Sequence, residues 1–263
     1  AEKVRIARII KELTDLLTSE KTESEEILLR AALLVSLMDN PDFQPKQYLD
    51  RVDRMANRIA QKIPKQISKR ETLDILIEEL FVQLGYHGST LDFHHRSNSY
   101  LNEVIDDREG LPITLTLLFL ELGKRIDLPI TGLATPGHFL ALYREPGQKL
   151  EDSVIIDAFS GRTISREYAN TLTHSELSDK DFAPASETEI INRILRNLLR
   201  SADWDRDVSA SLRYLDALVS INPKDRYHRT LRAMTQYGLG SFVEALVDIN
   251  YLIDQDPQDP ANA

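Results

Sequence analysis

The sequence contains no cysteine among its 263 residues. That absence excludes disulfide bonds, iron–sulfur clusters, cysteine-ligated zinc and a cysteine nucleophile. Positive charge is also scarce, since 32 Lys and Arg stand against 42 Asp and Glu, for a formal charge of −10. Nucleic-acid-binding proteins usually present a basic surface, so we expect no nucleic-acid partner.

Long hydrophobic runs are absent as well. The longest purely apolar run, Ala31–Val35, is far shorter than a membrane span. Residues 1–10 mix charged with apolar side chains, unlike a signal peptide. We therefore predict a cytoplasmic protein without a membrane partner. With 42% hydrophobic and 28% charged residues, the composition is that of a globular protein.

Helical periodicity dominates the first ninety residues. Apolar side chains recur at three- and four-residue spacing, which predicts helices near residues 6–17, 22–38, 48–59 and 72–84. Thr22 and Glu25 have the spacing of a capping box that opens the second helix, and Asn40-Pro41 should end it. Gly85 suits the C-terminal cap of the fourth helix.

The pattern changes between residues 85 and 168. Residues 97–99 (Ser-Asn-Ser) should cap a short helix that runs through Ile105, and Pro112 fits the first turn of a strongly apolar helix. Strand-like segments follow at 130–133, 138–143 and 154–157. Between the last two, Pro146-Gly147 fits the centre of a type II turn. Helices that lead into a small antiparallel sheet predict an α+β fold.

The last seventy residues contain a repeat. Pro223 and Pro257 lie 34 residues apart, and the same offset relates three pairs of apolar residues: Leu212 and Leu246, Leu215 and Ile249, Leu218 and Leu252. This is the period of the tetratricopeptide repeat, a helix–turn–helix unit. We predict such helical repeats over residues 186–263, docked on a domain of residues 1–185. Repeats of this type suggest a protein or peptide partner.

His138 and Asp157 form the candidate chemical pair. If Pro146-Gly147 is the centre of the hairpin, His138 lies opposite residue 155, and a slightly longer loop puts it opposite Asp157 on the same face. A carboxylate beside an imidazole fixes its tautomer and stabilises its charged form, as in a catalytic triad. The missing nucleophile would come from the helix beginning near Pro112, because a helix N-terminus favours negative charge.

A series of motifs in this order resembles the transglutaminase-like fold. The motifs are Gly110-Leu111-Pro112, Leu128-Pro129, Gly137-His138-Phe139 and Ile156-Asp157. A wider set, which adds Asn98-Ser99-Tyr100-Leu101, Ile113-Thr114-Leu115 and Pro136, is similar to the bacterial SirB-type family. The first member of that family joins a transglutaminase-like domain to tetratricopeptide repeats, and a eukaryotic F-box protein has a similar domain.

The resemblance implies a papain-like core that retains His138 and Asp157 and has Pro112 at the position of the catalytic cysteine. Proline has no nucleophilic side chain and no backbone N–H. Thr114 is another candidate nucleophile, but two residues round a helix is about 200°, which should turn it away from the direction of Pro112.

The sequence therefore predicts a catalytically silent domain that acts as a protein-binding or regulatory module. We expect no cofactor, and no metal at His87, His94 or His95, because no acidic residue completes a ligand set there. One alternative is an acyl-transfer or hydrolytic enzyme in which His138 activates water or a threonine. In another, His138 and Asp157 are a purely structural pair that holds two strands in register.

Overall fold

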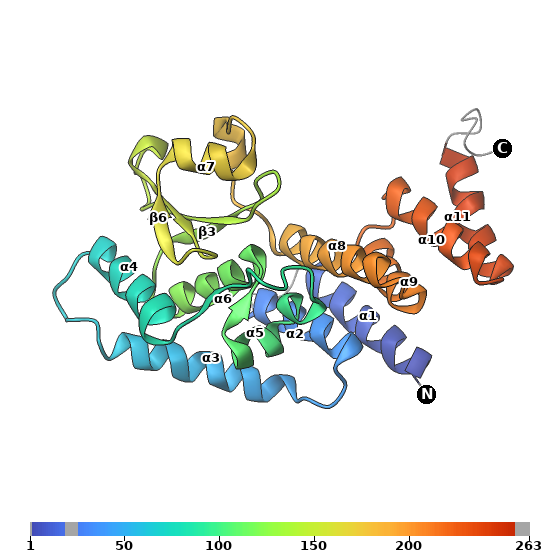
Figure 1. Cartoon of the computed structure of the whole chain (residues 1–263), viewed down its shortest axis with the longest axis horizontal. Helices are drawn as coiled ribbons and strands as arrows, with labels where there is room; N and C mark the ends of the chain where they lie inside the picture. Colours follow the sequence, from blue (N-terminus) through green and yellow to red (C-terminus); the bar gives the residue numbers. More distant parts are fainter. Residues whose placement is uncertain (1, 19–25, 256–263) are drawn as a thin grey trace. The chain divides into compact units, whose positions relative to one another are not determined.

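The structure, a computed structural model, describes residues 2–18 and 26–255 (Figure 1). Its contacts divide the chain into two units, one of residues 23–194 and one that combines residues 1–22 with residues 195–263. The domains 1–185 and 186–263 remain a prediction. The prediction assigns the first residues to the domain of residues 1–185. The contacts instead group them with the C-terminal helices, because α1 (Glu2–Thr18) packs against α9 (Val208–Ile221).

The larger unit begins with the helices that the apolar periodicity predicts. They are α2 (Ile27–Asp39), α3 (Pro45–Ala60) and α4 (Lys69–Ile77), which continues as a π-helical segment, Glu78–Gln83. Asn40 ends α2, and Gly85, with a φ of +73°, follows the last turn, both as predicted. The capping box predicted at Thr22 and Glu25 lies outside the described residues.

Helix α6 (Pro112–Arg125) forms the centre of this unit. Pro112 occupies its first turn, as predicted, and every residue from Pro112 to Gly123 is buried. Helix α3 packs on one side of α6, and strands β3 (Ile130–Leu133) and β4 (Leu140–Tyr143) pack on another (Figure 1). The helix is apolar over most of its circumference because it is enclosed in this way.

The sheet has four antiparallel strands in the order β3, β4, β5 (Val154–Asp157) and β6 (Arg162–Ile164). Helix α6 covers one face. On the other face lies a second apolar core, to which α7 (Arg166–Thr173) contributes Ala169. Figure 1 shows α6 and α7 on opposite sides of the strands. Helices with a small antiparallel sheet are the arrangement that the sequence predicts.

The connection from β4 to β5 is longer than predicted. Residues Glu145–Gln148 do form a turn, closed by a 3.0 Å hydrogen bond from the last N–H to the first C=O. Gly147 has a φ of +82°, as the third residue of a type II turn requires. A 3₁₀ helix, Leu150–Asp152, then adds residues before β5 begins.

The longer connection changes the register. Ala141 pairs with Ile156, and the β4–β5 ladder ends there. His138 therefore precedes β4 instead of lying within a strand. Its predicted position opposite residue 155 or Asp157 is wrong, because the hairpin does not close at Pro146-Gly147.

Several elements were not predicted from the sequence. They are three short strands, β6 and the parallel pair β1 (His87–Gly88) and β2 (Glu109–Gly110), and helix α7. Strands of two or three residues are too short for an alternating pattern to show. The predicted cap at residues 97–99 instead belongs to a 3₁₀ turn, Arg96–Ser99, and α5 (Leu101–Asp107) follows it.

The smaller unit is helical. Helix α8 (Glu187–Asp205) leads into α9, α10 (Arg226–Gly238) and α11 (Phe242–Gln255), and α10 contacts both of its neighbours. Helices α9 and α11 begin 34 residues apart (208 to 242) and end 34 residues apart (221 to 255). Pro257, which the repeat assignment also uses, lies outside the described residues. Within the described ranges, no helix is long and apolar enough to cross a membrane.

Candidate functional site

His138 and Asp157 are in direct contact. His138 Nε2 lies 3.0 Å from Asp157 Oδ1, and the two side chains are 13% and 3% exposed. His138 comes from the loop before β4, and Asp157 is the last residue of β5. The structure thus brings the two predicted residues together through neighbouring strands, although the register differs from the predicted one.

The Asp157 carboxylate has three hydrogen-bond partners. Besides His138, the Phe159 N–H donates to Oδ1 at 3.1 Å and the Ser160 hydroxyl to Oδ2 at 2.5 Å. Burial opposes ionisation, but the hydrogen bonds from His138 and Ser160 outweigh it and hold the pKa of Asp157 below its ordinary value. An ionised carboxylate only accepts, so the Nε2 of His138 carries a proton and its Nδ1 is the nitrogen left for a third group.

The loop before β4 fixes the backbone of His138. Gly137 has a φ of +66°, and the His138 N–H donates to the Pro136 C=O at 2.8 Å. The Thr135 hydroxyl donates to the His138 C=O at 2.9 Å. Arg193 Nη1 in turn donates to the Thr135 C=O at 2.7 Å. These bonds hold the imidazole over the end of β5.

A short series of contacts joins the pair to the N-terminus of α6. The Phe159 ring packs against the His138 ring, with the two ring centroids 6.3 Å apart. The backbone C=O of Phe159 accepts a hydrogen bond from the Gly88 N–H at 3.0 Å. A Cβ on Gly88 would lie 2.3 Å from the Phe159 ring, so only glycine fits there. Gly88 pairs with Gly110, and Pro112 follows two residues later. No pattern in the sequence predicts the roles of Gly88 and Phe159, because these roles depend on contacts between distant segments.

The first turn of α6 offers no free nucleophile. Pro112 is buried at its start. Thr114 is fully buried, and its hydroxyl accepts from the Leu111 N–H at 3.0 Å and donates to the Asn98 C=O at 2.8 Å. Because these bonds pair backbone groups at the N-terminus of α6, the Thr114 hydroxyl acts as part of the helix N-cap.

The three histidines before α5 have local roles. His95 Nδ1 lies 2.6 Å from Ser97 Oγ, at the start of the 3₁₀ turn. His87 Nδ1 lies 3.3 Å from the Gly88 C=O. The ring of His94 packs edge-on against Phe93, with centroids 5.4 Å apart. Across the described parts of the chain, no group of three or more His, Asp or Glu side chains is arranged to hold a metal ion.

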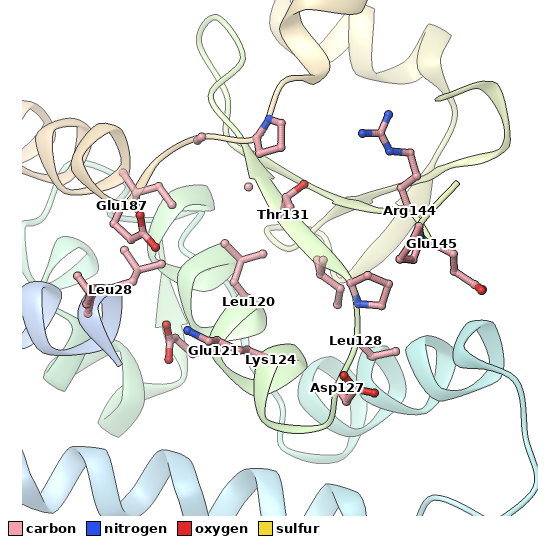
Figure 2. Close-up of a pocket in the computed structure, with 18 of the residues that line it drawn as sticks. Leu28, Leu120, Glu121, Lys124, Asp127, Leu128, Thr131, Arg144, Glu145 and Glu187 are labelled. Atoms are coloured by element: carbon pink, nitrogen blue, oxygen red, sulfur yellow. The ribbon is translucent and has the colours of Figure 1, made fainter. Parts of the chain in front are cut away.

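A cavity of about 670 Å³ follows the outer edge of β3, and neither His138 nor Asp157 lines it (Figure 2). We call it the β3-edge groove. The residues that define it here are Leu28, Leu120, Ile130, Thr131, Gly132 and Arg144. The sequence did not predict it, because it is assembled from segments that are far apart along the chain.

Comparison with known proteins shows which family this architecture represents. Residues 46–196, more than half of the chain, match the family model of the transglutaminase-like superfamily. The chain belongs to this superfamily. The match includes Pro112, His138 and Asp157, so the pair and the start of α6 lie within the transglutaminase-like part.

Relatives extend the similarity beyond that part. Protein SirB1 of Salmonella typhimurium is 26% identical over 235 residues, which cover 87% of this chain and 86% of that protein. YchA of Escherichia coli strain K12 is 24% identical over 225 residues, 83% of this chain and 82% of YchA. F-box only protein 21 of Pongo abelii is 25% identical over 187 residues, 68% of this chain but 30% of that protein. No solved structure matches the chain. These relatives support the SirB-type resemblance.

Proposed function

We propose that this chain is a catalytically silent member of the transglutaminase-like superfamily that acts as a protein-binding or regulatory module. The observation that carries the proposal is Pro112. Acyl transfer through a covalent intermediate needs a nucleophile beside the imidazole. The family resemblance puts that nucleophile at the start of α6, where this chain, which has no cysteine, has a buried proline. Thr114 does not replace it, because its hydroxyl is held by backbone groups.

The smaller unit supports the binding role. Helices α9 and α11 have the 34-residue offset of tetratricopeptide repeats, and we propose that α9–α11 belong to such repeats. Large apolar side chains of α11 are exposed: Phe242 by 55%, Val243 by 77% and Val247 by 61%. Exposed apolar surface of this kind is typical of protein contact sites.

An acyl-transfer assay tests whether the transglutaminase-like domain lacks catalytic activity. The purified chain is incubated with a fluorescent primary amine and a glutamine-containing acceptor protein. We expect no incorporation above a reaction without the chain. Robust turnover that disappears in His138→Ala would contradict the proposal.

One observation favours a second candidate function, hydrolysis with His138 as general base. His138 Nδ1 has no hydrogen-bond partner among the described residues, while Asp157 holds Nε2. A base so oriented could activate a water molecule against an amide or ester. This candidate requires a hydrolytic rate that His138→Ala abolishes and that the exposed variant Asp42→Asn leaves intact. An unchanged rate in His138→Ala removes it.

The cellular location and the remaining partners stay predictions. Composition favours the cytoplasm and argues against nucleic acid, as set out above. Fluorescence microscopy of a tagged chain would test the location directly, and a membrane or nucleoid pattern would contradict it.

A further inference from the structure

The outer edge of β3 carries backbone groups that β4 does not use. Strand β3 is at the end of the sheet, and on its paired side the Arg144 N–H donates to the Pro129 C=O at 3.2 Å. Backbone direction alternates along a strand, so Ile130 and Gly132 direct their N–H and C=O groups to the other side. That side borders the β3-edge groove.

Two of these four groups already have partners. The Gly132 C=O accepts from the Ala185 N–H at 2.8 Å, and the Ile130 N–H donates to the Leu128 C=O at 2.9 Å. The Ile130 C=O and the Gly132 N–H have no hydrogen-bond partner among the described residues. One acceptor and one donor, two residues apart, therefore face the groove.

This arrangement selects the direction of an added strand. In parallel pairing, one residue placed opposite Thr131 donates its N–H to the Ile130 C=O and accepts from the Gly132 N–H. In antiparallel pairing, the segment's residues opposite Ile130 and Gly132 would each meet one free and one occupied group, so one C=O and one N–H of the segment would stay unpaired. Only a segment parallel to β3 satisfies both free groups with a single residue and leaves neither backbone group of that residue unpaired.

The two faces of β3 select the side chains of such a segment. Its central residue would project on the face of Thr131, where Arg144 also lies, because Thr131 pairs with Leu142 and Arg144 is two residues further on. The Arg144 side chain is exposed, and its guanidinium has no hydrogen bond or ion pair among the described residues. An acidic side chain is its natural partner.

The residues on either side of the central one would project toward α6. The groove there is lined by apolar side chains of three helices, Leu28, Leu120 and Ile190. Figure 2 shows Leu28 and Leu120 on one side of β3 and Arg144 on the other. Apolar side chains fit the first side.

Other charged groups around the groove are largely balanced. Glu121 is paired with Arg125, and Asp127 with Lys69. Lys124 and Glu187 add one charge of each sign, and the carboxylate of Glu145 accepts a hydrogen bond from the Tyr143 hydroxyl at 2.5 Å. Arg144 is therefore the charge that remains to be matched on the Thr131 face.

We propose that the β3-edge groove binds an extended peptide segment of a partner protein, which adds to β3 as a parallel strand and places an acidic residue between two apolar ones. The inference names a surface for the binding role proposed above and rests on that role. It uses only the unit of residues 23–194 and does not involve the repeats.

Three synthetic peptides test the proposal by fluorescence anisotropy with the full chain. The first has the core Val-Glu-Val between Ser-Gly-Ser flanks, the second has Lys in place of Glu, and the third has an N-methylated Glu. We expect the first to bind about tenfold more tightly than the second, since a charge-assisted contact is at stake. N-methylation should weaken binding by about tenfold, because it removes the N–H that donates to the Ile130 C=O.

Protein variants locate the binding. Arg144→Glu should reverse the preference between the Glu and Lys peptides, whereas Arg54→Glu, an exposed arginine on α3, should leave it unchanged. The proposal would be overturned if the Val-Glu-Val peptide did not bind at concentrations up to about 1 mM. It would also be overturned if N-methylation of the peptide or the Arg144→Glu substitution left the affinity unchanged. Such a failure leaves the acyl-transfer assay unaffected, and turnover in that assay would not depend on Arg144.

Discussion

Asp157 determines which nitrogen of His138 carries the proton. The ionised carboxylate accepts from Nε2 at 3.0 Å, so Nδ1 is the nitrogen left to meet any third group. Ser160 and the Phe159 N–H hold the carboxylate in turn. The pair is therefore oriented as the His–Asp part of a catalytic triad would be, and the function proposed above places the missing nucleophile at Pro112.

The same contacts make stability depend on pH. We expect Asp157→Asn to lower the free energy of unfolding by about 2–4 kcal/mol at pH 7, because a buried, hydrogen-bonded charge is lost. The folded pKa of Asp157 is depressed, so its contribution is complete above the ordinary value of about 4 and is lost as pH falls through the folded pKa. Urea unfolding at pH 7 and pH 3 measures the difference. The control Asp42→Asn, at an exposed position, should change the free energy of unfolding little. If Asp157→Asn lowered this free energy equally at both pH values, the depressed pKa of Asp157 would be contradicted.

Gly88 should tolerate no side chain. A Cβ there would lie 2.3 Å from the ring of Phe159, which packs on His138. Gly88→Ala should therefore cost about 1–3 kcal/mol of unfolding free energy, and Phe159→Leu in the same chain should restore part of it. Thermal unfolding measures both. Gly238→Ala is the matched control, since nothing lies within 4 Å of its Cβ position and alanine favours a helix. Equal stabilities for Gly88→Ala and Gly238→Ala would show that Phe159 moves aside without cost.

Arg125 should be one of the most sensitive residues of the larger unit. It donates to Glu121 at 2.6 Å, Asp53 at 2.7 Å and Glu26 at 3.0 Å, and so ties α6 to α3 and to the start of α2. Burial raises the pKa of Glu121 despite the bond to Arg125. Arg125→Leu would leave that buried carboxylate without its cation, at a cost of about 3–5 kcal/mol.

A double variant separates charge from packing at Arg125. Adding Glu121→Gln should recover part of the stability that Arg125→Leu loses, because no buried charge then remains unpaired. Urea unfolding of the original chain, the two single variants and the double variant gives the coupling free energy between Arg125 and Glu121. Additive losses would mean that Glu121 and Arg125 act independently, contrary to the structure.

The parts of the fold that sequence predicts are those fixed by local patterns. The stripe of Ile9, Ile10 and Leu13 identifies α1, and Pro112 identifies the start of α6, since each signal lies within a few residues of its effect. The 3₁₀ turn Leu150–Asp152 has no such signal, and the register predicted for β5 is therefore wrong. His138 still contacts Asp157 because the loop before β4 and the end of β5 lie at the same end of two paired strands.

The β3-edge groove shows the opposite case. Leu28, Leu120 and Arg144 come from α2, α6 and the end of β4, and no spacing in the sequence relates them. Its two free backbone groups depend on which side of β3 is paired and on a single hydrogen bond from Ala185. Sites of this kind are invisible until the chain is folded.

The absence of cysteine allows a direct test of the site itself. Pro112→Cys would introduce a single thiol at the start of α6, where the helix dipole lowers the pKa of a thiol and a facing imidazole would lower it further. If Pro112 faces His138, alkylation by iodoacetamide should be about tenfold faster in Pro112→Cys than in Pro112→Cys combined with His138→Ala. Asp42→Cys, an exposed thiol away from the pair, should react at the same rate with or without His138. Mass spectrometry of the alkylated chain gives the rates. Equal rates for the two Pro112 variants would mean that His138 does not activate a thiol at this position, which would favour the interpretation of His138 and Asp157 as a structural pair.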